Sequence, residues 1–414
     1  MLAFRGTRLQ SREAGCCRSG RASPDPRARR IRFAFVLLVL AGSIGLVVYV
    51  FVGYPAVMAA WAAVRRRPVA RDPAFTPDVS LIVAAYDEAD VIDAKLLDVA
   101  ALDYPAERLQ VIVVADGSRD DTAERARGHA GVLVLHRPER MGKLAAVERA
   151  VLAATGDVLV LSDANNLYSP DALRELVAPL ADPGVGLVAG AKVIEAGDGD
   201  SPDAAEGLYW RYESKLKEWE SATGSVIGAP GEIMAIRREA YRSPPADTMN
   251  EDFVQAMRVA LEGWRVVYAP RARSTERASA TVADEAVRRS RLVTGRSQAL
   301  RALMPELVRS QPGLAWRVVS HKGLRPAVPW LLVVAALANV ATLRRHPRTR
   351  LLGLGQALFY GAAGVGWRDS RRGRRRKAFF LPYYFCRMNL ATLRGLRDFA
   401  ANRREHVWAR VQRG

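Results

Sequence analysis

The chain has 414 residues, half of them hydrophobic, and a formal net charge of +19. This length allows two or three domains together with membrane segments. Residues 76–300 hold 26 Lys/Arg and 36 Asp/Glu, whereas the two flanks hold 36 Lys/Arg and 7 Asp/Glu. A nucleic-acid-binding domain carries its basic residues on the folded part, so this distribution argues against nucleic acid as a partner. Basic residues that border apolar segments instead favour anionic lipid headgroups.

The cysteines and histidines predict neither a disulfide framework nor a zinc site. Cys16 and Cys17 are adjacent in a polar stretch, Cys386 lies far from them, and the five histidines are scattered. Neither residue type shows the spacing of metal ligands or of a stapled small domain.

The N-terminal region predicts a basic tail followed by a membrane anchor. Residues 1–31 are rich in Arg, Gly, Ser and Pro, and we expect them to be disordered. Residues 32–67 contain an apolar run from Phe33 to Val52 that continues after Pro55 to Val64. About 20 such residues span a bilayer, whereas the apolar part of a cleaved signal peptide has only about 7 to 15. We therefore expect a retained transmembrane helix.

Residues 76–300 alternate strands with helices. Runs of aliphatic residues predict strands at Val79–Ala84, Leu109–Ala115, Val132–His136 and Val158–Ser162. Helical patterns lie at Glu88–Ala101, Asp121–Gly128 and Gly142–Thr155. A further helix is expected at Ser169-Pro170-Asp171, with Ser169 as its cap and Pro170 in its first position. Repeated βαβ units predict an α/β fold with a mostly parallel sheet.

Acidic side chains follow the ends of the predicted strands. Asp116 comes after the second strand, Asp163 and Asn165 come after the fourth, and Asn250-Glu251-Asp252 comes later. Open α/β sheets bind ligands at the carboxyl ends of their strands. Transfer of a sugar from a nucleotide needs a base for the acceptor hydroxyl and a cation for the departing diphosphate. Carboxylates at this edge suit both tasks.

In its motifs the chain resembles the membrane-bound family-2 glycosyltransferases, which are inverting enzymes of the GT-A (Rossmann-like) fold, and among them bacterial exopolysaccharide synthase subunits. The resemblance covers about Pro77 to Leu300. Each motif alone is weak, but the ordered series is strong. The series consists of the strand from Val79 to Glu88, Asp116-Gly117-Ser118, Arg140-Met141-Gly142-Lys143, Asp163-Ala164-Asn165, Asn250-Glu251-Asp252 and Arg288-Arg289-Ser290-Arg291-Leu292.

The resemblance implies a role for each of these positions. Asp252 would be the general base, with Glu251 beside it. Asp163 and Asn165 would bind a divalent metal ion, Mg²⁺ or Mn²⁺, and Arg288 with Arg291 would contact acceptor or phosphate groups. The nucleotide would be bound by Ala84, Tyr86, Glu88, Asp116, Lys143 and Asp163.

Two departures from the family pattern leave alternatives open. Asn165 stands in place of an aspartate, so the metal ion would bind less tightly unless substrate phosphates supply more of the charge. Leu292 stands where polymerising members have a tryptophan, which leaves open a transferase that adds a single sugar to a lipid carrier. Both departures also suit a non-catalytic subunit or scaffold.

The remaining segments predict one aromatic helix and a second membrane region. Residues 203–222 predict a helix with Tyr209, Trp210, Tyr212 and Trp219, for which we favour a core role over sugar binding. Residues 301–323 predict an interfacial amphipathic helix. Residues 324–396 predict a membrane hairpin and a third apolar helix, and residues 397–414 a basic tail.

The expected chemistry places the protein in the inner (cytoplasmic) membrane. Nucleotide sugars are cytoplasmic, so residues 76–300 would face the cytoplasm of a multi-pass protein. Its partners would be a nucleotide-sugar donor, preferably uridine diphosphate-linked, a glycan or lipid-linked acceptor, membrane lipids and any membrane partner subunits. Basic residues flank the first apolar segment on both sides, so the positive-inside rule does not fix its orientation.

Overall fold

The computed structural model describes residues 26–194, 203–276, 281–344, 347–374 and 376–403. The predicted N-terminal tail lies outside these residues up to residue 25, and the C-terminal tail from residue 404. Residues 26–31, expected in the tail, form the first turns of a helix.

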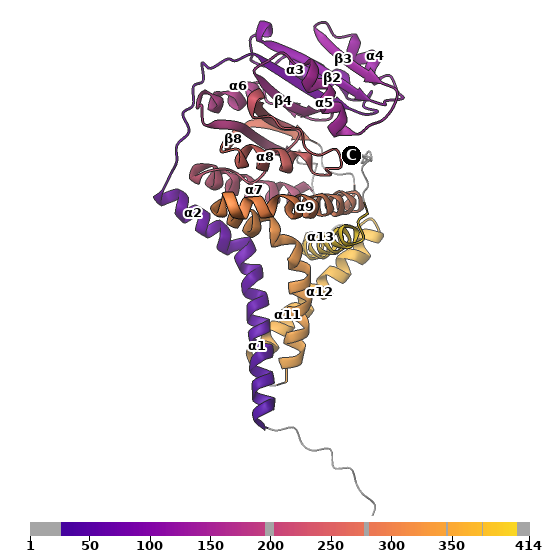
Figure 1. Cartoon of the computed structure of the whole chain (residues 1–414). Helices are drawn as coiled ribbons and strands as arrows, with labels where there is room; N and C mark the ends of the chain where they lie inside the picture. Colours follow the sequence, from indigo (N-terminus) through magenta and orange to yellow (C-terminus); the bar gives the residue numbers. More distant parts are fainter. Residues whose placement is uncertain (1–25, 195–202, 277–280, 345–346, 375, 404–414) are drawn as a thin grey trace, which may run out of the picture.

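The centre of the fold is one mixed sheet of eight strands in the order β3-β2-β1-β4-β7-β6-β8-β5 (Figure 1). The strands are β1 (Val79–Ala85), β2 (Leu109–Asp116), β3 (Val132–Arg137), β4 (Val158–Asp163), β5 (Leu167–Tyr168), β6 (Val185–Ile194), β7 (Ile233–Arg237) and β8 (Arg265–Glu276). Strands β1 to β4 confirm the four predicted strands and are parallel. β7 runs antiparallel to β4 and β6, and β5 antiparallel to β8, so the sheet is parallel only in part.

Helices cover both faces of this sheet. They are α3 (Ile92–Ala100), α4 (Thr122–Arg127), α5 (Lys143–Ala153), α6 (Ala172–Val177), α7 (Asp203–Thr223) and α8 (Glu251–Leu261), with 3₁₀ turns at Ala106–Arg108, Ala178–Ala181 and Arg238–Ala240. The expected start of α6 is wrong: the helix begins at Ala172 with Asp171 at its N-cap. The Ser169 hydroxyl is buried and has no hydrogen-bond partner among the described residues, so it does not cap the helix.

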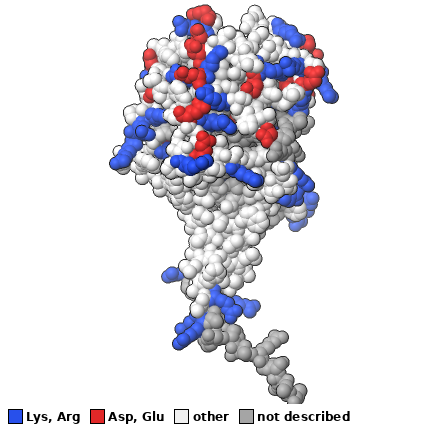
Figure 2. Space-filling model, in the orientation of Figure 1, with Lys and Arg blue, Asp and Glu red and all other residues white. Residues whose placement is uncertain are grey.

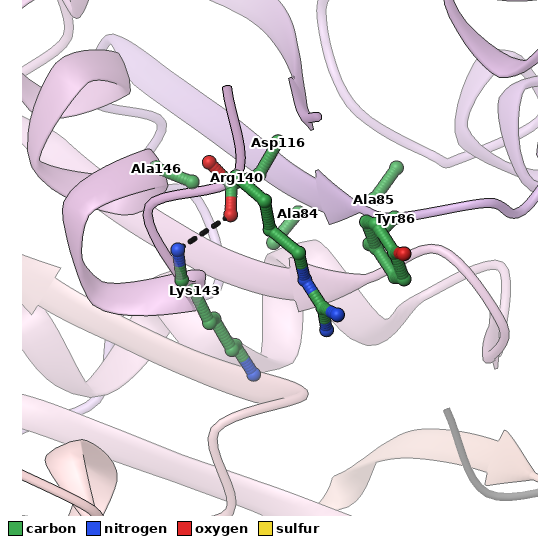
Figure 3. A pocket seen from close by; sticks show the side chains of 8 residues that line it. Ala84, Ala85, Tyr86, Asp116, Arg140, Lys143 and Ala146 are labelled. Carbon is green, nitrogen blue, oxygen red and sulfur yellow. Dashed lines mark hydrogen bonds between the residues drawn. The ribbon is translucent and has the colours of Figure 1, made fainter. Parts of the chain in front are cut away.

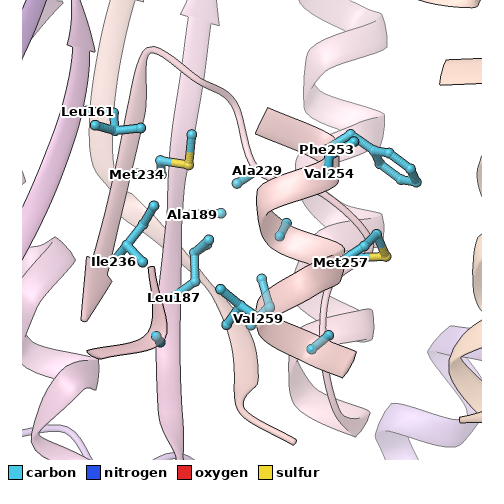
Figure 4. Close-up of a cluster of buried hydrophobic side chains, with 14 of the residues drawn as sticks. Leu161, Leu187, Ala189, Ala229, Met234, Ile236, Phe253, Val254, Met257 and Val259 are labelled. Atoms are coloured by element: carbon cyan, nitrogen blue, oxygen red, sulfur yellow. The ribbon is translucent and has the colours of Figure 1, made fainter. Parts of the chain in front are cut away.

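The core holds α8 against the second half of the sheet (Figure 4). Leu161, Met234 and Ile236 of the sheet pack with Phe253 and Met257 of α8 in one buried cluster. Burial of each such side chain contributes about 1.5–3 kcal/mol. The opposite face of the sheet packs on α3 and α6. The start of α8 is therefore fixed rigidly at the sheet edge.

The N-terminal helices form one continuous helical segment that bends and leads to the α/β domain (Figure 1). α1 (Pro26–Val48), a π-helical turn (Tyr49–Gly53) and α2 (Tyr54–Val64) follow one another without a break. Tyr54 and Met58 are buried against Leu216, Tyr212 and Trp219 of α7. The core role favoured for Tyr212 and Trp219 is confirmed.

The C-terminal helices follow from α9 (Val282–Ser310), which runs beneath the α/β domain (Figure 1). The remaining elements are α10 (Pro312–Val318), a π-helical turn (Val319–Gly323), a 3₁₀ turn (Arg325–Ala327), α11 (Val328–Thr342), α12 (Pro347–Arg371) and α13 (Lys377–Ala400). The boundary expected at residue 301 falls inside α9, because the helix continues through Pro305. α11 packs beside α1, and α13 packs on both α9 and α12.

Two helices among the described residues are long and apolar enough to cross a membrane, Arg30–Val64 and Pro312–Thr342. α12, the second arm of the predicted hairpin, does not meet this test. Figure 2 shows a band free of charged side chains around the lower helices, with Lys and Arg gathered at its far end.

Candidate active site

A pocket opens at the carboxyl ends of β1 and β2, beside the start of α5 (Figure 3). This pocket is lined by Ala84 and Tyr86 of the first motif and by Asp116 of the second. The sequence predicts all three as nucleotide-binding residues. The lining residues are Ala84, Ala85, Tyr86, Asp116, Arg140, Gly142, Lys143 and Ala146. The topology of the parallel strands brings the separate motifs to one edge.

Asp116 holds the turn that precedes α5. Its carboxylate is buried and accepts hydrogen bonds from the amides of Met141, at 3.1 Å, and Gly142, at 2.6 Å. Gly117 has φ +69°, and a Cβ there would lie 2.8 Å from the Arg140 backbone. Only glycine fits this close approach without strain. Asp116 therefore positions Arg140 and Lys143 at the pocket.

Arg140 covers the ring of Tyr86 in the same pocket. The guanidinium carbon lies 3.6 Å from the ring centroid, which is a cation–π contact (Figure 3). A flat, charged surface of this kind suits an aromatic base or a phosphate group. The motif alone does not predict a site role for Arg140, although its place just before Gly142-Lys143 is a signal for one.

Glu88 does not line this pocket. Its carbonyl accepts hydrogen bonds from the amides of Val91 and Ile92, and its own amide donates to the Thr122 hydroxyl. The backbone of Glu88 therefore supports the start of α3. Direct nucleotide contact by Glu88 stays a prediction.

Lys143 connects the pocket to the other motifs. Its Nζ donates to Asp163 Oδ1 at 2.5 Å. A Cβ built on Gly231 would lie 3.6 Å from the same Nζ and 3.7 Å from Asp252 Oδ2, so lysine and aspartate meet at this glycine. Burial opposes the charge of Lys143, but Asp163, Glu251 and Asp252 together raise its pKa.

Glu251 and Asp252 occupy the first turn of α8, where carboxylates are favoured by the helix dipole. Asp252 Oδ1 accepts a hydrogen bond from the Phe253 amide at 2.7 Å. Burial raises the pKa of Asp252, and the charge of Lys143 partly opposes the rise. Burial likewise raises the pKa of Glu251. A raised pKa makes a carboxylate a stronger base.

The two arginines predicted from α9 lie in different surroundings. Arg291 is close enough to Glu251, Asp163 and Asp252 for their charges to raise its pKa, although burial outweighs them and lowers it. Arg288 Nε instead lies 3.4 Å from Glu285 Oε2 on the same helix. Arg291 therefore lies within electrostatic reach of the carboxylates of Glu251, Asp163 and Asp252.

The predicted metal ligands fit an ion that substrate phosphates help to hold. Asn165 Oδ1 is buried and has no hydrogen-bond partner among the described residues, which suits an oxygen that binds a metal ion. Asp163 offers a carboxylate, one oxygen of which contacts Lys143. The described part of the chain contains no group of three His, Cys, Asp or Glu side chains that could hold a metal ion by themselves. Further ligands would have to come from phosphates, as is common for Mg²⁺.

Lys95 contacts the turn that carries Asn165 and Asn166, and the sequence analysis does not predict this role. It is fully buried, and its Nζ donates to Asn166 Oδ1 at 3.1 Å. Burial lowers the pKa of Lys95 to about 8. The available signal was a lysine on the apolar face that Ile92, Leu96 and Val99 form.

A mixed α/β sheet with carboxylates gathered at one edge is the architecture of a GT-A-like nucleotide-dependent transferase. Residues 80–243 match the family model described as Glycosyl transferase family 2. The chain therefore contains a glycosyl transferase family 2 domain.

Curated relatives include synthases of polysaccharides. A poly-beta-1,6-N-acetyl-D-glucosamine synthase of Staphylococcus aureus (strain MSSA476) is 25% identical over 199 residues, which cover 46% of this chain and 48% of that protein. An N-acetylglucosaminyltransferase of Rhizobium meliloti (strain 1021) is 28% identical over 231 residues, 50% of this chain and 52% of that protein. The chain thus spans about half the length of these relatives.

One solved structure matches almost the whole chain. The mannosyltransferase PcManGT from Pyrobaculum calidifontis, in complex with GDP-Man and Mn²⁺, has a TM-score of 0.67 and 25% sequence identity. The match covers 90% of this chain and 99% of that protein, so the likeness extends beyond the α/β domain to the helices around it.

Proposed function

We propose that this protein is a membrane glycosyltransferase that moves a sugar from a nucleotide-sugar donor to a glycan or lipid-linked acceptor. The observation that carries the proposal is the meeting of Lys143, Asp163 and Asp252 beside the pocket of Tyr86 and Asp116. The family domain and the likeness to a mannosyltransferase support it.

The mechanism we propose is a single displacement with inversion at the anomeric carbon. Asp252 accepts the proton of the acceptor hydroxyl as its oxygen bonds to that carbon, and the bond to the diphosphate breaks. Glu251 lies next to Asp252, and its negative charge helps to keep the proton affinity of the pair high. Lys143 and Arg291 offset phosphate charge. A divalent ion held by Asp163 and Asn165 would neutralise the departing diphosphate.

The donor in this proposal is uridine diphosphate-linked, with a guanosine diphosphate-linked sugar as the alternative. The alternative is favoured by the GDP-Man bound to the mannosyltransferase of matching fold. Thermal stabilisation by a panel that includes UDP-GlcNAc and GDP-Man, each with Mn²⁺, separates the two.

The product can be a polymer or a single added sugar. The synthases among the relatives favour a polymer, whereas Leu292, in place of the family's tryptophan, favours one sugar on a lipid carrier. Product sizing with purified enzyme separates them, because a ladder or a single addition is directly visible.

We also propose that Arg30–Val64 and Pro312–Thr342 place the protein in the cytoplasmic membrane, with the α/β domain in the cytoplasm. The N-terminal end of α1 would then lie across the membrane. Its exposed Arg27 and Arg30 run against the positive-inside rule, unless the helix lies in the interface.

Replacement of Asp252 tests the proposed reaction. Asp252→Asn removes the proton acceptor and leaves a side chain of similar shape, so sugar transfer should fall by about 10²- to 10⁴-fold. Donor binding, measured by thermal stabilisation, should persist. Asp247→Asn, an exposed carboxylate in the preceding loop, is the matched control and should transfer at the normal rate.

Near-normal transfer by the Asp252→Asn variant would refute the assigned base. Donor binding without transfer in the unmodified protein, over several donors and acceptors, would instead favour a non-catalytic subunit.

A further inference from the structure

A buried ionic cluster lies where α7 meets the segment between α10 and α11. Glu213 is 2% exposed, and Oε1 lies 2.6 Å from Arg325 Nη1. Its Oε2 lies 2.9 Å from Lys322 Nζ and 3.2 Å from His321 Nε2. Figure 1 shows these helices between the α/β domain and the apolar helices. One carboxylate thus faces several basic groups at this junction.

Several guanidinium nitrogens of this cluster are buried without partners. Arg325 is 7% exposed and uses Nη1 for Glu213 and the Tyr209 hydroxyl, but its Nε and Nη2 have no hydrogen-bond partner in the described chain. The same holds for Nε of Arg289 and of Arg296. A buried polar atom without a partner destabilises the fold, and more so when it is charged. The unpaired N–H groups of this cluster can donate hydrogen bonds to a bound anion.

Arg289 and Arg296 share one face of α9, two turns apart, and Arg296 lies close enough to Arg289 and to Arg325 to interact with both charges. Burial lowers the pKa of Arg296, and the positive charges of Arg289 and Arg325 lower it further. Within the ranges that the structure describes, neither Arg289 nor Arg296 forms an ion pair with a carboxylate. Glu213 and Glu220 are already paired with Arg325, Lys322 and His321, so positive charge is in excess.

This cluster lies between the proposed base and the apolar helices. The charge of Arg296 acts on Asp252, where it opposes the effect of burial on the pKa. Arg325 stands just before α11, whose first residue is Val328. α11 exposes apolar side chains along its length, among them Trp330 at 57% and Leu337 at 66%. A ligand that contacts both the arginine cluster and the apolar surface of α11 needs a negatively charged group and an apolar chain.

We propose that Arg289, Arg296 and Arg325 hold the phosphate of a lipid-phosphate-linked acceptor, so that the sugar of this acceptor reaches Asp252. The proposal rests on the proposed function and names its acceptor class. Guanidinium groups suit phosphate because their planar N–H groups donate in pairs. The lipid chain lies along the apolar surface of α11. The acceptor hydroxyl gives its proton to Asp252 and bonds to the anomeric carbon of the donor, and the lipid phosphate is unchanged.

Binding of a lipid phosphate to the purified full chain tests this proposal. The probes are a short-chain polyprenyl monophosphate, the matching polyprenol and inorganic phosphate, each scored by native mass spectrometry and thermal stabilisation in detergent. The polyprenyl phosphate should bind at least about tenfold more tightly than the polyprenol, which corresponds to about 1.4 kcal/mol. Arg296→Gln should remove most of this preference. Arg301→Gln, an exposed arginine of the same helix, should keep it.

The readouts separate the possible failures. Equal binding of phosphate and alcohol, or an Arg296→Gln variant that keeps the preference, overturns the lipid-phosphate site. Binding of inorganic phosphate as tight as that of the lipid overturns the lipid as its source. Arg289→Gln is a second variant in case Arg296→Gln does not fold. Donor binding is measured in parallel. If the unmodified protein does not bind a donor, the result counts against the proposed function. If it binds a donor but shows no preference for the lipid phosphate, the result counts only against this acceptor.

Discussion

Single residues at the candidate site owe their properties to burial and to a few neighbouring charges. Asp116 illustrates how far sequence reasoning reaches. The motif predicts its place at the strand end correctly, but the two amides that occupy its carboxylate come from residues 25 and 26 positions later. Hydrogen bonds between residues so far apart along the chain depend on side-chain geometry that cannot be predicted from one sequence. Arg296, which lies outside the motifs, was missed for the same reason.

The acid limb of the pH–rate profile should report on Asp252. Burial raises the pKa of Asp252, and only its deprotonated form can accept a proton, so transfer should rise with pH through a value above the ordinary aspartate pKa of about 4. Glu232 contributes to the rise through its negative charge. Glu232→Gln should therefore move the acid limb to lower pH, by less than about one unit because burial is the larger cause.

The matched control for that profile is Glu239→Gln, a carboxylate whose side chain is 65% exposed. This variant should leave the limb in place. The assignment of the acid limb to Asp252 would be contradicted if the Glu232→Gln variant moved the limb to higher pH. It would also be contradicted if the limb had the same midpoint pH in the Glu232→Gln and Glu239→Gln variants.

At the scale of elements, α9 is the helix that joins the site to the C-terminal helices. It carries Arg289, Arg291 and Arg296, and α13 packs along it. The Thr294 hydroxyl donates to the Gly395 carbonyl of α13 at 2.9 Å. Sequence periodicity placed a boundary within this helix, because the basic and apolar residues after residue 300 read as an interfacial segment. Tertiary packing continues the helix instead.

Gly395 sets the approach of α13 to α9, and adding one methyl group there tests the packing. A Cβ at Gly395 would lie 2.5 Å from the Ser290 carbonyl oxygen and 2.9 Å from Val293 Cβ. Gly395→Ala should destabilise the protein by about 1–3 kcal/mol through overpacking. Thermal unfolding in detergent measures the change.

Gly364 of α12 supplies the comparison, since nothing lies within 4 Å of its added Cβ. Gly364→Ala should be neutral or stabilise by up to about 1 kcal/mol, because alanine favours helix more than glycine does. Equal melting temperatures for the two alanine variants would show that α13 does not pack on α9 as described.

For the whole molecule, the main division is between the α/β domain and the apolar helices. The alternating pattern predicted the first half of the sheet and the existence of the apolar helices. It did not predict the reversal at β7, because a short strand inserted between β4 and β6 looks the same in either direction. The order of motifs still identified the family, since their positions at strand ends survive this reversal.

The same substitution on the two parts tests which surface meets lipid. Leu337 of α11 is 66% exposed and Leu152 of α5 is 87% exposed. Leu337→Arg should reduce the protein recovered in alkali-washed membranes, because a charge near the centre of a membrane helix costs about 2.5–3.5 kcal/mol. Leu152→Arg faces water in our proposal and should leave the yield unchanged. Equal recovery of both variants would argue against α11 as a membrane helix.

In the proposed membrane placement, α11 alone does not complete its span. Its 15 residues rise about 22 Å, less than the hydrocarbon thickness of about 30 Å. The rest of the span Pro312–Thr342 lies before Val328 and includes Arg325. Arg325 would therefore stand near the headgroup level of the cytoplasmic leaflet, where a lipid phosphate reaches it without leaving that leaflet.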